Sequence, residues 1–77
     1  MVDYNRISNE ALAFLEYAKA ETPDIIFITL INPAEDTVTV YAQKVTPVII
    51  RRSLCYTFDD FFYRSFESIH KALLLKF

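Results

Sequence analysis

The sequence predicts an α+β domain with the order α-β-β-β-α, in which a three-stranded antiparallel meander carries two helices packed on one face. Apolar residues recur at helical spacing near both ends of the chain, at 5–20 and 58–75. Between them, three runs are apolar or alternate with a period of two, as strands do. The connections are four to five residues long, which favours hairpins. Each helix has one apolar stripe, so both helices should cover the same side of the sheet.

The first helix is expected at 5–20, because its apolar residues fall on one stripe. The stripe comprises Ile7, Ala11, Phe14 and Ala18. The helix should end before Thr22-Pro23, since the residue that precedes a proline avoids helical dihedral angles.

The first strand is expected at 24–31, with the sequence DIIFITLI. Successive side chains of a strand point to opposite faces, and here both faces are apolar. One face carries Ile25, Phe27, Thr29 and Ile31, and the other carries Ile26, Ile28 and Leu30. Such a strand needs cover on both sides, and a chain of 77 residues has little material to supply it.

The second and third strands follow a turn at 32–36 that contains proline. The second, at 37–43, alternates cleanly and places Val38 and Val40 on one face. The third, at 48–55, places Arg51 and Arg52 on opposite faces, with Arg52 on the apolar side. Either a bulge switches the faces there, or Arg52 lies at the edge of the core beside a carboxylate.

The last helix is expected to be continuous over 58–75. Thr57 and Asp60 form a capping box at its start. The apolar stripe along it comprises Phe58, Phe62, Phe66, Ile69 and Leu73.

The uncovered sheet face is the candidate partner-binding site. We expect the helices to cover the face of Val38 and Val40, and Thr29 favours placing the other apolar side of the first strand there as well. The site then consists of Ile25, Phe27, Ile31, Tyr41, Ile49 and Arg51. Aromatic residues and arginine are enriched at the centres of interfaces. The first strand should also be an uncovered edge of the sheet. The alternative is that a tilted helix or the C-terminal tail covers this surface.

Composition excludes several classes of site within residues 1–77, which we expect to form one small α+β domain. The absence of glycine excludes a phosphate-binding loop and a dinucleotide fingerprint. One cysteine, Cys55, cannot form an internal disulfide or a cysteine-based zinc site. No apolar run reaches the ~18 residues of a membrane span, and the N-terminus lacks the apolar core of a signal peptide. These observations predict a cytoplasmic protein without a cofactor, a metal or a membrane partner.

Catalysis is not expected, because the chemically active side chains have simpler explanations. Cys55 is expected to be a small buried apolar residue. His70 is expected on the surface near the C-terminus of the last helix. Asp59 and Asp60 suit the positive N-terminal end of that helix, and adjacent helical positions point about 100° apart, which disfavours a shared metal.

The sequence therefore predicts a small protein–protein interaction module: a homodimer, an adapter or an inhibitor of another protein, of the accessory type that phages and mobile elements encode. The alternative is a nucleic-acid-binding module with Phe27 and Tyr41 as stacking platforms and Arg51 beside them. Its α-β-β-β-α order is that of double-stranded RNA-binding domains. Those domains begin the last helix with lysines, whereas this chain has the acidic sequence FDDF at 58–61 and a net charge of −2.

Overall fold

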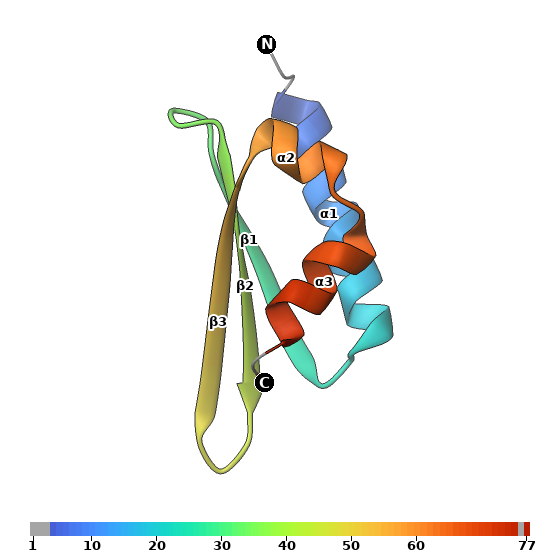
Figure 1. Cartoon of the computed structure of the whole chain (residues 1–77), viewed down its shortest axis with the longest axis vertical. Helices are drawn as coiled ribbons and strands as arrows, with labels where there is room; N and C mark the ends of the chain where they lie inside the picture. The colour runs from blue at the N-terminus through green and yellow to red at the C-terminus, as the bar shows by residue number, and fades with distance from the viewer. Residues whose placement is uncertain (1–3, 76) are drawn as a thin grey trace.

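The computed structural model describes residues 4–75 and 77 and confirms the predicted α+β fold. Its elements are α1 (Tyr4–Glu21), β1 (Ile25–Asn32), β2 (Thr37–Val45), β3 (Ile49–Thr57), α2 (Phe58–Tyr63) and α3 (Phe66–Leu74). The strands form an antiparallel meander in the order β1-β2-β3. Figure 1 shows the helices together on one side of the sheet, as predicted.

The predicted stripe of α1 is the buried face of that helix: Ile7, Ala11, Phe14 and Ala18 are its buried residues. The helix ends where Thr22 donates twice to the carbonyl of Ala18, from its backbone N–H at 2.9 Å and from its hydroxyl at 3.1 Å. Pro23 follows and has no N–H with which to continue the helix.

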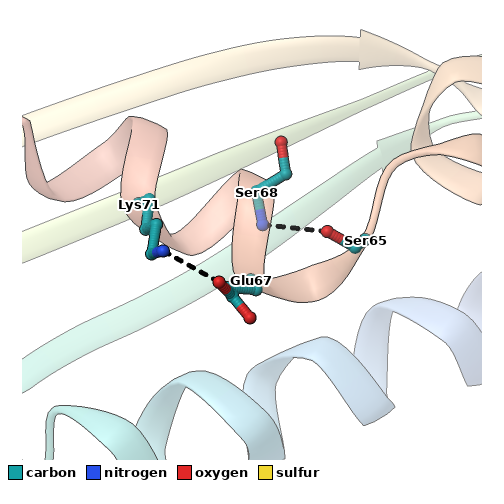
Figure 2. A network of polar contacts seen from close by, with 4 residues as sticks. All are labelled: Ser65, Glu67, Ser68 and Lys71. Carbon is teal, nitrogen blue, oxygen red and sulfur yellow. Dashed lines mark hydrogen bonds and ion pairs between the residues drawn. The ribbon is translucent and has the colours of Figure 1, made fainter.

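The last helix was predicted as continuous and is instead divided in two. Arg64 and Ser65 adopt extended conformations, with ψ of 142° and 152°. The Ser65 hydroxyl accepts a hydrogen bond from the Ser68 backbone N–H at 3.1 Å and so caps α3 (Figure 2). A serine side chain satisfies the free donors of a new helix start better than it suits a helix interior. The predicted cap at Thr57 is confirmed, since Asp60 N–H donates to its hydroxyl at 3.1 Å.

Figure 2 also shows the ion pair between Glu67 and Lys71, one turn apart on α3, with 2.8 Å between Oε1 and Nζ. The hydrogen bond from Lys71 lowers the pKa of Glu67. Both side chains are exposed, so the pair contributes little to stability because water screens it.

The strands pair residue for residue, from Thr37–Thr57 to Val45–Ile49 between β2 and β3. The predicted bulge beside Arg52 is therefore wrong. Arg52 is half-buried on the helix side of β3. No carboxylate in the described residues lies within ion-pair distance of it, so the other alternative also fails. Instead, its position on an edge strand keeps the side chain partly in water.

The β1–β2 turn forms without glycine. The side-chain oxygen of Asn32 accepts hydrogen bonds from the backbone N–H groups of Ala34 (3.1 Å) and Glu35 (3.3 Å). Asp36 has a φ of 53°, a left-handed conformation that aspartate tolerates better than most residues. The carbonyl of Asp36 accepts from the N–H of Phe58 at 2.9 Å, which ties the turn to the start of α2.

The core lies between the helices and the sheet, around the ring of Phe14. This ring is fully buried and meets three others edge to face: Phe66, Phe61 and Phe27, with centroid distances of 5.6, 6.1 and 6.3 Å. Side chains from α1, β1, α2 and α3 therefore converge at one point, and aromatic pairs of this geometry add to the stability that burial supplies.

The assignment of the two faces of β1 was the wrong way round. Ile25 is buried against the helices, and Phe27 and Ile31 pack against the same core. Ile26, Ile28 and Leu30 are exposed on the opposite side. The reason is the aromatic cluster: Phe27 has the largest side chain of the strand, and it finds its partners among the helices. Thr29 is half-buried and pairs with the buried Val40, so it lies on the helix side. Its polar side chain therefore did not indicate the exposed face of the strand.

His70 was predicted on the surface and is buried, with 7% of its area exposed. Its Nε2 lies 3.0 Å from the Thr22 hydroxyl. Its ring contacts those of Phe27 and Tyr17, with centroid distances of 5.6 and 5.7 Å. The new start of α3 at Ser65 changes which residues face inward, and this brings His70 into the core beside Ile69.

Candidate protein-binding surface

The open face is the side of the sheet opposite the helices. The strand register arranges it in cross-strand rows. One row is Ile26–Gln43–Arg51, the next is Ile28–Tyr41–Ser53, and the third is Leu30–Thr39–Cys55. Val45 and Ile49 form a further row near the β2–β3 turn. The alternation of each strand places these residues on one side.

Large apolar side chains lie exposed along this face. The exposed fractions are 53% for Ile26, 57% for Ile28, 57% for Leu30, 41% for Tyr41 and 58% for Ile49. Isolated apolar side chains are normal on a protein surface, but a contiguous patch marks an interaction site. Ile26, Ile28, Leu30 and Tyr41 are contiguous, because they occupy adjacent positions in neighbouring rows, whereas Ile49 lies beyond the row of Gln43 and Arg51, beside Val45.

The predicted site is divided by the sheet. Tyr41, Ile49 and Arg51 lie on the open face. The other predicted members, Ile25, Phe27 and Ile31, lie on the helix side and cannot touch the same partner. The predicted site omits the three exposed apolar residues that β1 contributes to the open face, Ile26, Ile28 and Leu30. The signal that would have found them is the aromatic character of Phe27, which belongs with the phenylalanines of the helices.

A hollow of ≈ 390 Å³ lies over the rows of Ile26 and Ile28 on the open face. Ile26, Ile28, Tyr41, Gln43 and Arg51 line it from the open face, and Ala42 and Arg52, whose side chains lie on the helix side, also border it. Arg51 Nε donates to Gln43 Oε1 at 3.0 Å, which holds the guanidinium at the rim. That bond uses one of five guanidinium donors. The hollow thus combines aliphatic walls with one oriented cation.

β1 is an edge of the sheet, as predicted. Its sequence, IIFITLIN, contains neither charge nor proline, which are the features that usually protect an edge from pairing with another chain. A second hollow of ≈ 310 Å³ lies beside this strand, between Leu15 and Lys19 of α1 and Phe27. β3, at the opposite edge, carries Arg51 and Arg52.

The described end of the chain does not cover the open face. Phe77 packs against the core, and its N–H donates to the carbonyl of Leu74 at 3.1 Å. In the described residues, the C-terminal tail therefore does not cover the apolar surface, contrary to the alternative considered from the sequence.

The groups considered for catalysis are separated by the sheet. Cys55 is exposed, not buried as predicted, and lies on the open face, whereas His70 is buried on the helix side. Across residues 4–75 and 77, no cluster of three or more His, Cys, Asp or Glu side chains is placed to hold a metal ion. Of the helices described, none combines the length and hydropathy needed to cross a membrane.

The fold and this surface define a small α+β domain with one covered and one open sheet face. No family model, curated protein sequence or solved structure matches the chain.

Proposed function

We propose that this chain is a protein-interaction module whose binding surface is the open face. One observation carries the proposal: Ile26, Ile28 and Leu30 stand about half exposed on a sheet face that the helices do not cover. Aliphatic side chains in this position lose contact with water only when another surface packs on them.

The size of the effect supports a binding role. Fully burying an aliphatic side chain yields about 1.5–3 kcal/mol, so burying the exposed half yields about 1 kcal/mol for each. The five exposed aliphatic residues of the open face therefore contribute about 5 kcal/mol from this side of an interface, and a similar partner surface contributes about as much. These residues are Ile26, Ile28, Leu30, Val45 and Ile49. Association costs about 4–15 kcal/mol, so the roughly 10 kcal/mol from both sides exceeds the lower part of that range and supports weak, reversible binding.

The nucleic-acid alternative loses its stacking platform. Phe27 lies in the core against Phe14 and His70, while Tyr41 lies on the open face. The two rings cannot stack successive bases on one surface. The first turn of α2, where a phosphate contact would be needed, carries Asp59 and Asp60. We therefore retain protein binding as the proposal.

Within this proposal, the chain acts in the cytoplasm as an adapter, an inhibitor or another small accessory protein. The exposed thiol of Cys55 supports a reducing compartment, because an exposed unpaired cysteine is readily oxidised elsewhere. Fractionation of cells that express the tagged chain tests the location, and recovery outside the cytoplasm would contradict it.

Affinity capture with matched variants tests the binding role. The bait proteins are the wild type, Ile28→Glu and Leu12→Glu, incubated with an extract of the organism that encodes the chain. Leu12 is the matched control, because it is 57% exposed like Ile28 but lies on α1. We expect the wild type and Leu12→Glu to retain the same proteins and Ile28→Glu to lose them. Equal retention by all three baits would contradict a role for the open face.

A further inference from the structure

We propose that the partner of the open face is a second copy of this chain, stacked face to face about a two-fold axis that crosses the strands. This inference rests on the proposed function and names its partner. The resulting dimer has two sheets at the centre and the helices of each copy outside.

The area of the face suits a weak dimer. Three strands spaced about 4.8 Å apart, with nine residues of about 3.3 Å each, present about 400 Å² of flat surface per copy. Two copies together bury about 800 Å² if each face is treated as flat. This is slightly below the lower limit of about 1,000 Å² for specific interfaces. The dimer should therefore dissociate on dilution.

The shape of the face is self-complementary in one orientation. The hollow lies over the rows of Ile26 and Ile28, and Leu30 protrudes one row further along the same strand with 57% of its area exposed. A two-fold axis that crosses the strands at Ile28 and Tyr41 reverses the order of the rows. Leu30 of each copy then lies opposite Ile26 of the other, over the hollow, and the two Ile28 side chains meet. Two sheets packed about 10 Å apart interdigitate in this way.

The charge distribution favours the same orientation. Arg51 is the charged side chain of the rows that make up the open face. With the axis across the strands, β3 lies over β3 of the other copy, and Arg51 lies opposite Cys55 at the edge of the sheet. The two arginines are then about 13 Å apart along the strands, beyond the screening length of about 8–10 Å. An axis along the strands would instead place Arg51 opposite Ile26 of the other copy, so that a charge would cover an aliphatic side chain that the proposed axis pairs with Leu30.

Sedimentation equilibrium of the full chain between about 1 and 200 µM tests the dimer, since association depends on concentration. We expect the wild type to pass from a 9.0 kDa monomer to a dimer. Leu30→Glu should weaken the dimer about 100-fold or more. Leu12→Glu, with the same exposed fraction on α1, should leave it unchanged. A folded wild type that stays monomeric at the highest concentration overturns the proposal, as does a dimer that survives Leu30→Glu.

Cross-linking tests the orientation. With Cys55→Ser removing the native thiol, Ser53→Cys places a new thiol on the central row of β3. The proposed axis sets the two Ser53 positions opposite each other, so a short bis-maleimide should link the copies at dimer-forming concentration. Leu12→Cys in the same background is the control and should stay unlinked. A dimer whose Ser53→Cys variant is not linked, or is linked no faster than the control, overturns the proposed axis.

The two proposals fail in distinguishable ways. A monomeric wild type whose capture of another protein is lost in Ile28→Glu overturns the second copy as partner and leaves the open face as a binding surface. A monomeric wild type whose capture is unaffected by Ile28→Glu overturns both.

Discussion

The ring of Phe27 on β1 meets the ring of Phe14 on α1 edge to face, with 6.3 Å between their centroids and an angle of 89° between their planes. This contact decides which side of β1 faces the helices. Once Phe27 is held there, strand alternation places Ile26, Ile28 and Leu30 on the other side, where they remain exposed.

Phe27→Glu and Ile28→Glu, at adjacent positions, should have opposite consequences. Phe27→Glu buries a carboxylate among the rings of Phe14 and His70 and should unfold the chain, because a buried charge without a partner is costly. Ile28→Glu places its charge on the open face and should keep the stability of the wild-type monomer within about 1 kcal/mol. Circular dichroism and urea unfolding measure both. Equal stability of the two variants would contradict the assignment of the faces.

Phe14→Ala should lower the free energy of unfolding by about 3–5 kcal/mol, as truncation of a fully buried aromatic residue does. Phe14 has 0% of its area exposed and touches three other rings. Leu12→Ala on the same helix is the control, and it should cost less than about 1 kcal/mol because Leu12 is exposed. Urea titration followed by far-UV circular dichroism compares them, and similar losses would remove Phe14 from the centre of the core.

Ser65→Ala should cost about 1 kcal/mol, because it removes the side-chain acceptor that caps α3. Ser65→Asp should retain the cap, since aspartate is an equally good N-cap residue. Ser68 contributes its backbone N–H to the same bond, so Ser68→Ala is the matched control and should have a smaller effect. Thermal unfolding ranks the variants. If Ser65→Ala were as stable as the wild type, the division of the last helix would not depend on this cap.

Alkaline pH should destabilise the protein in part through Tyr56. Burial raises the pKa of this tyrosine, whose ring packs beside Phe61. The folded state therefore keeps its proton where the unfolded chain, with a pKa of about 10, has lost it. The corresponding stability is fully present below about pH 10 and is lost as the pH rises from there through the folded pKa. Urea midpoints at about pH 8 and pH 11 should differ less in Tyr56→Phe than in the wild type, and an equal difference would contradict this assignment.

Much of the fold could be predicted because its periodic patterns have one interpretation each. The buried residues of α1 recur at helical spacing, and Val38 and Val40 alternate with polar neighbours along β2. In both elements the apolar side is the side that must leave water. Thr57 could be recognised as a helix cap because the requirement for an acceptor is local. Ser65 was missed because the apolar residues around it continue at helical spacing across the break.

The sequence by itself determined the order of the elements, the meander and the fact that one apolar face of β1 would lack cover, since these depend on local periodicity and on the short length of the chain. Only the tertiary structure decided which face that is. Both sides of β1 are apolar, so the hydrophobic effect, which is non-directional, does not distinguish them. The choice falls to shape: the space around Phe14 is filled by an aromatic ring, and close packing at that point holds Phe27 and His70 inward and leaves Ile26, Ile28 and Leu30 outward.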